Sequence, residues 1–154
     1  MTFTFTDEQE EWLTSLENEV YGQHRHSVGQ YNYGKPCYCC LGVANKLFAP
    51  ELESVVSGNI FFEDNDADIH EKAKQKLNLR DHGNYSYDKD YVNYIISICD
   101  KKKLSYSNSE IIRKFDLQNL MCLNDDLEFT FPEIASVIRK FPTIFFNNNE
   151  QWFE

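Results

Sequence analysis

The 154-residue sequence lacks the features that mark several large classes of protein. It has no apolar run near the ~20 residues that a membrane span needs. Its first twelve residues, MTFTFTDEQEEW, contain neither the basic nor the apolar segment of a secretion signal. Six glycines and four prolines are too few for a fibrous or low-complexity chain. These absences predict a globular protein that is neither secreted nor bound to a membrane.

Positive charge is also scarce, since 15 Lys and Arg stand against 25 Asp and Glu for a net charge of −10. A sequence-independent nucleic-acid binder needs surplus cations to displace counterions, so we expect no nucleic-acid partner. The charge is uneven: residues 51–68 hold six acids and no base, and residues 69–103 hold eight bases against five acids. This pattern fits two solvated faces, an acidic patch for a basic partner, or an anion site beside the basic stretch.

Apolar and aromatic residues, by contrast, are plentiful. They make up 42% and 15% of the chain, and a chain of this length can bury one sizeable core. Five cysteines is an odd number, and Cys37, Cys39 and Cys40 are crowded together. Neighbouring cysteines rarely pair with each other, so the pattern favours reduced thiols in a cytosol.

Helical periodicity and capping signals dominate the predicted local structure. The predicted helices cover residues 7–19, the stretch from Cys39 to Pro50, residues 68–77 with Asp68 as the cap, residues 89–101, a short segment after Ser107, and residues 130–141. Residues 23–38 are predicted to be irregular or a short hairpin, residues 59–62 extended, and residues 81–84 a hairpin turn. The sequence therefore predicts a compact, helix-rich α+β fold, a single domain over 1–154 with a small antiparallel β element.

The cysteine cluster allows two kinds of chemistry. With His24 and His26, the three crowded thiols offer metal ligands, but the paired CxxC pattern of zinc sites is missing, so we expect neither a metal nor another cofactor. Alternatively, Cys39 or Cys40 at a helix start is a nucleophile.

For a cysteine nucleophile, the chain supplies partners in the order that papain-like proteases use. Gln23 precedes the thiols as an oxyanion donor, His82 (or His70) follows as the base, and Asn124 or Asp125 comes last. The aromatic residue that follows the papain-type cysteine is absent. A cysteine-dependent hydrolase or transferase is therefore the alternative, and a protein without catalytic activity is the main expectation.

An ordered series of motifs resembles a family of small proteins encoded by tailed bacteriophages and prophages. The series comprises Trp12-Leu13-x-x-Leu16, Tyr21-x-Gln23, Cys39-Cys40-Leu41-Gly42-Val43, Leu120-x-x-Leu123-Asn124-Asp125 and Phe131-x-Glu133-Ile134-Ala135-x-x-Ile138. The likeness covers residues 12–46, 77–84 and 120–139. The chain departs from it at Asn45-Lys46, at His24 and His26, and by an insert around residues 85–115.

The resemblance implies a phage accessory protein that acts by binding in the host cytoplasm. Small acidic phage proteins counteract host defence by masking a host protein or by sequestering a nucleotide second messenger, and both partners are open here. The candidate ligand or partner contacts are Tyr21, Gln23, Lys72, Lys76, Arg80, Asn124 and Asp125. The lysines and Arg80 would contact phosphates, and tyrosines would stack on bases.

Two of these candidate contacts also have a structural interpretation. Asn124 and Gln23 lie at junctions between predicted elements, where polar side chains commonly bond the backbone. We expect them to be hydrogen-bonded struts, with a shared ligand pocket as the alternative. The aromatic tail, residues 142–154, is expected to dock on its own domain, or on a second copy in a homodimer.

Overall fold

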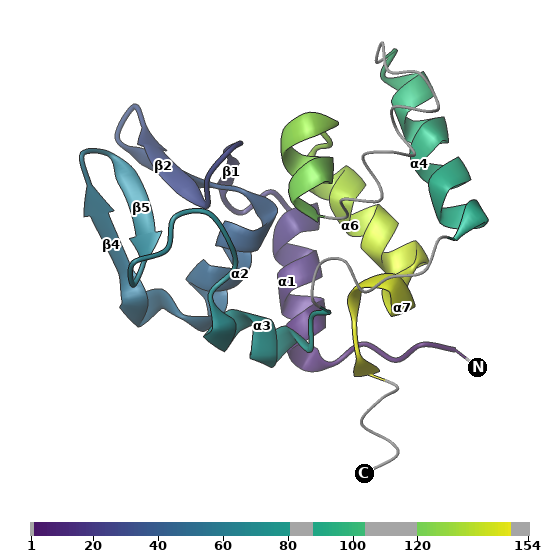
Figure 1. Ribbon diagram of the computed structural model, residues 1–154, viewed down its shortest axis with the longest axis horizontal. Helices are drawn as coiled ribbons and strands as arrows, with labels where there is room; N and C mark the ends of the chain where they lie inside the picture. Colours follow the sequence, from purple (N-terminus) through teal and green to yellow (C-terminus); the bar gives the residue numbers. More distant parts are fainter. Residues whose placement is uncertain (1, 81–87, 104–119, 149–154) are drawn as a thin grey trace.

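The computed structural model describes residues 2–80, 88–103 and 120–148. Helix α1 (Asp7–Glu17) lies at the centre, with a five-stranded sheet on one side and helices α4 (Lys89–Lys101), α6 (Phe131–Lys140) and α7 (Pro142–Phe145) on the other (Figure 1). The predicted α+β fold is confirmed. The expected insert around 85–115 includes α4, and the predicted turn at 81–84 and helix after Ser107 lie outside the described residues.

Helix α1 begins at the predicted capping box. The Thr6 hydroxyl accepts a hydrogen bond from the Gln9 amide at 3.2 Å, and the Gln9 side chain accepts one from the Thr6 amide at 2.9 Å. These bonds satisfy two amides that the helix leaves free. The buried face carries Trp12, whose indole N–H donates to the Cys40 carbonyl at 3.0 Å. The Trp12 bond thus holds α1 against the segment that contains Cys40.

Helix α2 (Cys40–Phe48) begins where predicted, and the 3₁₀ turn η1 (Pro50–Leu52) follows it. Helix α3 (Glu71–Leu77) starts later than predicted, because His70 and not Asp68 is its N-cap. The His70 ring accepts from the Lys72 amide at 3.1 Å, whereas the Asp68 carboxylate accepts from its neighbour Ile69 at 2.7 Å. Asp68 lies three residues before the first helical residue, Glu71, so it stands outside the N-cap position.

The sheet has the strand order β1-β3-β2-β5-β4. Its strands are β1 (Gly22–Gln23), β2 (Gly29–Asn32), β3 (Lys35–Tyr38), β4 (Glu53–Val56) and β5 (Asn59–Phe62). The expected hairpin within 23–38 and the extended segment 59–62 are confirmed. The sheet is larger than the small antiparallel element predicted and is mixed, because β1 pairs in parallel with β3.

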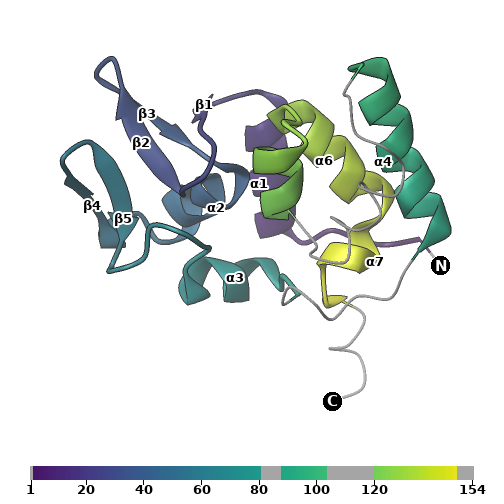
Figure 2. The same ribbon diagram turned by 45° about the horizontal axis from the view of Figure 1, so that its top comes forward.

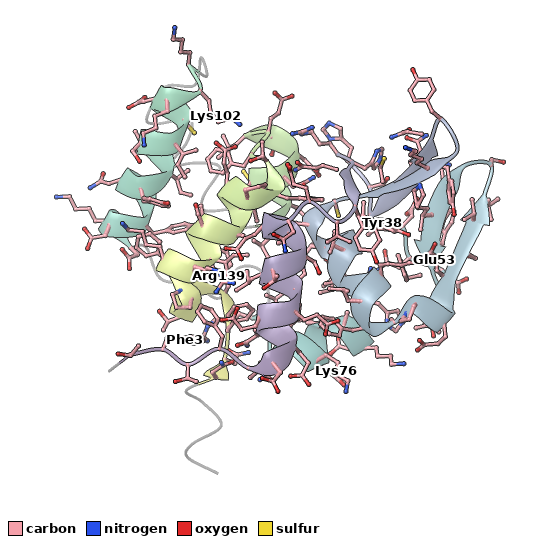
Figure 3. All side chains as sticks on the ribbon, turned by 180° about the vertical axis from the view of Figure 1, so that it is seen from behind. Phe3, Tyr38, Glu53, Lys76, Lys102 and Arg139 are labelled. Carbon is pink, nitrogen blue, oxygen red and sulfur yellow. The ribbon has the colours of Figure 1, made fainter. Side chains whose placement is uncertain are left out.

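Helix α6 begins at a second capping box. The Thr130 hydroxyl accepts from the Glu133 amide at 3.3 Å, and the Glu133 carboxylate accepts from the Thr130 amide at 2.8 Å. Pro142 ends α6 as predicted and also begins α7. Before α6, residues Cys122–Asp126 form a π-helical turn, η2. Arg139 of α6 bonds Glu10 and Glu17 of α1, which joins the two helices (Figure 3).

The first part of the aromatic tail docks on the same chain. Phe145 and Phe146 are buried, and the Phe146 ring lies 6.2 Å from those of Phe5 and Trp12. Phe146 also forms a β-bridge with Leu79. This part of the expectation is confirmed, and the last six residues lie outside the described part of the chain. Across the described helices, none combines the length and apolarity needed to cross a bilayer.

Candidate functional site

The fold brings five of the predicted site residues to one junction, among them Asp125, which follows Asn124 in the chain. Gln23 ends β1, Cys39 and Cys40 begin α2, and Asn124 lies in η2. These segments are far apart in sequence but lie together beside the C-terminal end of α1 (Figures 1 and 2). The junction therefore contains residues from three of the motifs that carry the family resemblance.

Asn124 is the hub of the junction and is fully buried. Its side-chain oxygen accepts from the Gln23 amide group at 2.8 Å and from the Cys40 backbone N–H at 3.3 Å. Its side-chain nitrogen donates to the His24 carbonyl at 2.9 Å and to the Asp125 carboxylate at 2.7 Å. All of its hydrogen-bonding capacity is therefore used within the protein. This is the arrangement expected of a strut.

Asp125 and Arg25 extend the same network toward the surface. Asp125 accepts from the His26 amide at 3.0 Å, and His26 has a positive φ of 77°. The Arg25 guanidinium donates to the Asn124 carbonyl at 3.0 Å. Because a positive φ is unfavourable for a residue with a side chain, the Asp125 bond helps to hold this turn in place.

The Tyr21 ring and the two imidazole rings do not join the hydrogen bonds made by the Asn124 side chain; His24 takes part through its backbone carbonyl alone. The Tyr21 ring packs edge-on against Tyr38, with centroids 5.3 Å apart. The His24 ring contacts the Ser27 hydroxyl at 2.9 Å, and burial lowers the pKa of His24. Within the described ranges, no three His, Cys, Asp or Glu side chains are grouped closely enough to hold a metal ion.

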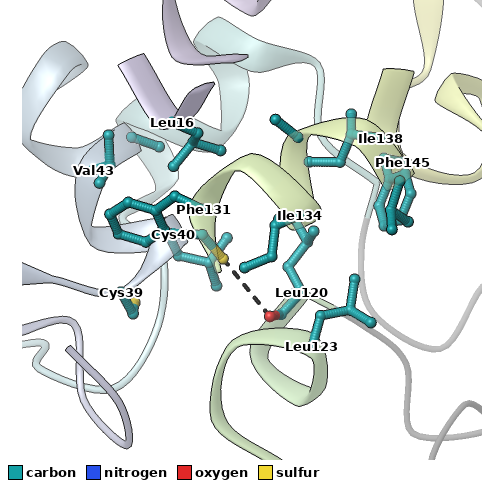
Figure 4. Close-up of a cluster of buried hydrophobic side chains, with 14 of the residues drawn as sticks. Leu16, Cys39, Cys40, Val43, Leu120, Leu123, Phe131, Ile134, Ile138 and Phe145 are labelled. Carbon is teal, nitrogen blue, oxygen red and sulfur yellow. Dashed lines mark hydrogen bonds between the residues drawn. The ribbon is translucent and has the colours of Figure 1, made fainter. Parts of the chain in front are cut away.

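The two thiols at the start of α2 are buried and hydrogen-bonded. Cys39 is the N-cap of the helix, and its sulfur accepts from the Gly42 amide at 3.3 Å. The Cys40 thiol donates to the Leu120 carbonyl at 3.7 Å, among apolar side chains that include Phe131 (Figure 4).

This environment acts against nucleophilic chemistry. Burial raises the pKa of Cys39 to about 12 and raises the pKa of Cys40 well above its ordinary value. A catalytic thiol needs the opposite shift, because the thiolate is the reactive form. Of the two histidines suggested as the general base, His82 lies outside the described residues, and the His70 ring caps α3 and also contacts the Glu63 carboxylate. The geometry therefore gives the cysteine-enzyme alternative no support.

The rates of thiol labelling are expected to follow the exposure of the three thiols. In native protein at pH 8, half-exposed Cys37 should react with a maleimide first, and Cys39 and Cys40 should react at least about a hundredfold more slowly, because they are buried and remain protonated. Mass spectrometry of the labelled peptides measures the rates, and unfolded protein, in which all five thiols react, is the control. Labelling of Cys39 or Cys40 as fast as Cys37 would contradict this assignment.

The basic candidates lie elsewhere. They belong to α3 and the residues after it, and the Gln9 side chain of α1 joins this region by donating to the Leu77 carbonyl at 2.8 Å. Gln9 is in the first turns of α1, whereas Gln23 follows its other end, so the two candidate sets occupy opposite ends of this helix. Lys76 projects from the end where α1 begins (Figure 3). The structure therefore does not bring the predicted contacts into one site.

Two of the three basic candidates are also engaged within the chain. Lys72 forms an ion pair with Glu51, and the Arg80 guanidinium donates to the Thr143 carbonyl at 3.0 Å. Lys76 is exposed. An anion site here would have to displace the Glu51 carboxylate from Lys72, although an ion pair as exposed as this one is weak.

Among the described residues, five large apolar side chains are exposed: Val20 after α1, and four on a different part of the molecule, which the sequence did not predict as a site. Tyr31 and Tyr33 belong to the β2–β3 hairpin and are 39% and 106% exposed, while Val55 and Val56 of the β4–β5 hairpin are 47% and 58% exposed. Both hairpins project side by side from the end of the molecule opposite α4 (Figures 1 and 2). No family model, curated protein or solved structure matches the chain.

Proposed function

We propose that this protein is a non-enzymatic binding protein that masks a surface of another protein with its two β-hairpins. The observation that carries the proposal is the exposure of Tyr31, Tyr33, Val55 and Val56 at one end of the molecule. Aromatic and apolar side chains gathered on an exposed surface mark protein-binding sites. The setting that fits the family resemblance is a phage accessory protein that counteracts host defence in the host cytoplasm.

The rival function, sequestration of a nucleotide signal, has weaker support. It requires cations that are free to contact phosphates, and Lys72 is paired with Glu51. It would also profit from convergence of Tyr21, Gln23 and Asn124 on a ligand, whereas the Asn124 side chain is fully used within the protein. Masking a protein surface needs neither feature.

The experiment compares two positions for a photo-crosslinking amino acid. Placed at Tyr33, it is expected to give discrete adducts with a bacterial host protein in extract, and placed at Lys76, an exposed control position away from the hairpins, it is expected to give none. Equal adducts at both positions, or none at Tyr33, would contradict the proposal.

A thermal-shift measurement tests the rival directly. Cyclic nucleotides are expected to leave the melting temperature unchanged. A nucleotide that binds the native state would add about 2.7 kcal/mol of stability at a hundred times its Kd, which is readily detected. Such a shift would favour nucleotide sequestration over masking.

A further inference from the structure

Strand β4 is the outermost strand of the sheet, and its free edge has an unusual character. It pairs with β5 on one side, and in the described part of the chain no strand pairs with it on the other. Exposed edges in natural proteins are commonly protected by lysine, proline or a bulge. The strand reads Glu-Ser-Val-Val. It is short, at four residues, and its one charged side chain, Glu53, is paired with Lys46, but it has no lysine, proline or bulge, and both valines are about half exposed.

The register shows which backbone groups face outward. The hairpin turn Ser57–Gly58 has positive φ at both residues, so Val56 and Asn59 form the closing hydrogen-bonded pair. Hydrogen-bonded and non-bonded residue pairs alternate along an antiparallel ladder. The bond from the Glu63 amide to the Leu52 carbonyl, 2.9 Å, shows that this alternation continues to the end of the hairpin away from the turn.

The Val55 N–H and C=O therefore point away from β5, as does the Glu53 carbonyl, and the described residues provide no hydrogen-bond partner for the Val55 amide. The Glu53 amide is already bonded to Pro50. The edge thus offers one donor flanked by two acceptors in the spacing that an added strand requires.

The charges around this edge select the kind of partner. Residues 51–68, which contain both strands of the hairpin, carry six acids and no base. Glu51 and Glu53 are paired with Lys72 and Lys46 of this chain, so the net negative charge comes from the other four acids, which include the exposed Asp64 at the same end of the hairpin. A second copy of this chain would bring like charges together, whereas a basic segment would be attracted.

We propose that β4 receives an extended, basic segment of the partner protein, which adds to the sheet as a sixth strand. This inference rests on the proposed masking function and specifies how the partner is held. The backbone of the segment bonds the Val55 edge. Val55 and Val56 face opposite sides of the sheet, so the apolar side chains of an alternating segment cover one of these valines. Its lysines or arginines are attracted to the acidic end of the hairpin.

The probe is a synthetic peptide in which Val alternates with Lys, and its binding to the full chain is measured by calorimetry and by amide NMR shifts. We expect binding that shifts the amides of β4. The control peptide has the same side chains but is N-methylated at alternate residues, so it keeps the charge and loses the donors. It is expected to bind at least about tenfold more weakly. Equal binding of the two peptides would overturn strand addition, as would absence of binding by the first.

A matched pair of variants tests the same edge by changing the protein instead of the peptide. Val55→Pro removes the outward N–H without removing a bond to β5, and Val55→Thr keeps that N–H. We expect at least about a tenfold loss of peptide affinity in the first and little change in the second. Unchanged affinity of a folded Val55→Pro variant would overturn the proposal, and the N-methylated peptide decides the same question if this variant does not fold.

The crosslinking at Tyr33 separates this inference from the function on which it rests. Host adducts at Tyr33 together with failure of the peptide tests would retain masking and reject strand addition. Loss of the Tyr33 adducts would reject masking itself, whatever the peptide does.

Discussion

Replacing Asn124 with alanine is expected to lower the free energy of unfolding by about 3 kcal/mol. The change removes the acceptor of the buried Cys40 amide and the donor to the His24 carbonyl, and it leaves the Gln23 side chain with the Phe129 carbonyl as its remaining partner. Each buried polar group left without a partner costs about 1–3 kcal/mol. Denaturant unfolding followed by circular dichroism measures the loss.

The matched control for this prediction is Asn93→Ala. Asn93 is exposed on α4, where alanine is the better helix former, so stability should be unchanged or slightly increased. If Asn124→Ala melted at the wild-type temperature but lost partner binding, Asn124 would be a ligand contact and not a strut. That outcome would restore the pocket interpretation of the junction.

Gly42→Ala is expected to be at least as harmful, although alanine has the higher helix propensity by ~1 kcal/mol. A β-carbon at Gly42 would lie 2.0 Å from the Val28 carbonyl oxygen and 3.1 Å from the Tyr38 side chain. That carbonyl cannot easily move, because it accepts the Cys39 amide at 3.1 Å. Overpacking of this kind costs about 3 kcal/mol, measured by the same unfolding experiment.

Gly34→Ala separates steric contact from backbone conformation. Gly34 has a φ of 79° and no neighbouring atom within 4 Å of an added β-carbon, so the expected cost is the conformational penalty alone, ~1 kcal/mol. A Gly42→Ala variant no less stable than Gly34→Ala would show that α2 does not pack tightly against the segment before β2. Close packing would then no longer explain the glycine of the Cys39–Val43 motif.

Most of the helical structure could be predicted from the sequence, because its signals are local. The capping boxes at Thr6 and Thr130 join residues three apart, so both partners are visible in one short window. The periodic apolar residues of α1 and α4 likewise identify their buried faces. Where two nearby polar residues compete, local signals are weaker: Asp68 and His70 both precede α3, and the bond from the His70 amide to Asn45, 2.8 Å, helps to place the true cap.

The candidate site could be predicted only as a set of residue types. Gln23 and Asn124 both lie at predicted element junctions, but their direct bond joins residues 101 positions apart and depends on how η2 packs against β1. Nothing in the sequence indicates that Lys72 is paired with Glu51, or that the basic candidates lie at the other end of α1. The chemical character of Cys39 and Cys40 also depended on burial, which raises the pKa of both thiols.

The sequence by itself therefore determined the starts of α1, α2 and α6, the α+β class and the acidity of residues 51–68, since each follows from residue types within a few positions of one another. The tertiary structure alone decided that β4 is an edge strand, that Val55 and Val56 are exposed, and that Asn124 is a buried hub. A strand of four residues has the same local pattern at the edge of a sheet and at its centre. Its place is set by pairing with β5 and by the packing of α2 on the sheet, which are contacts between distant parts of the chain.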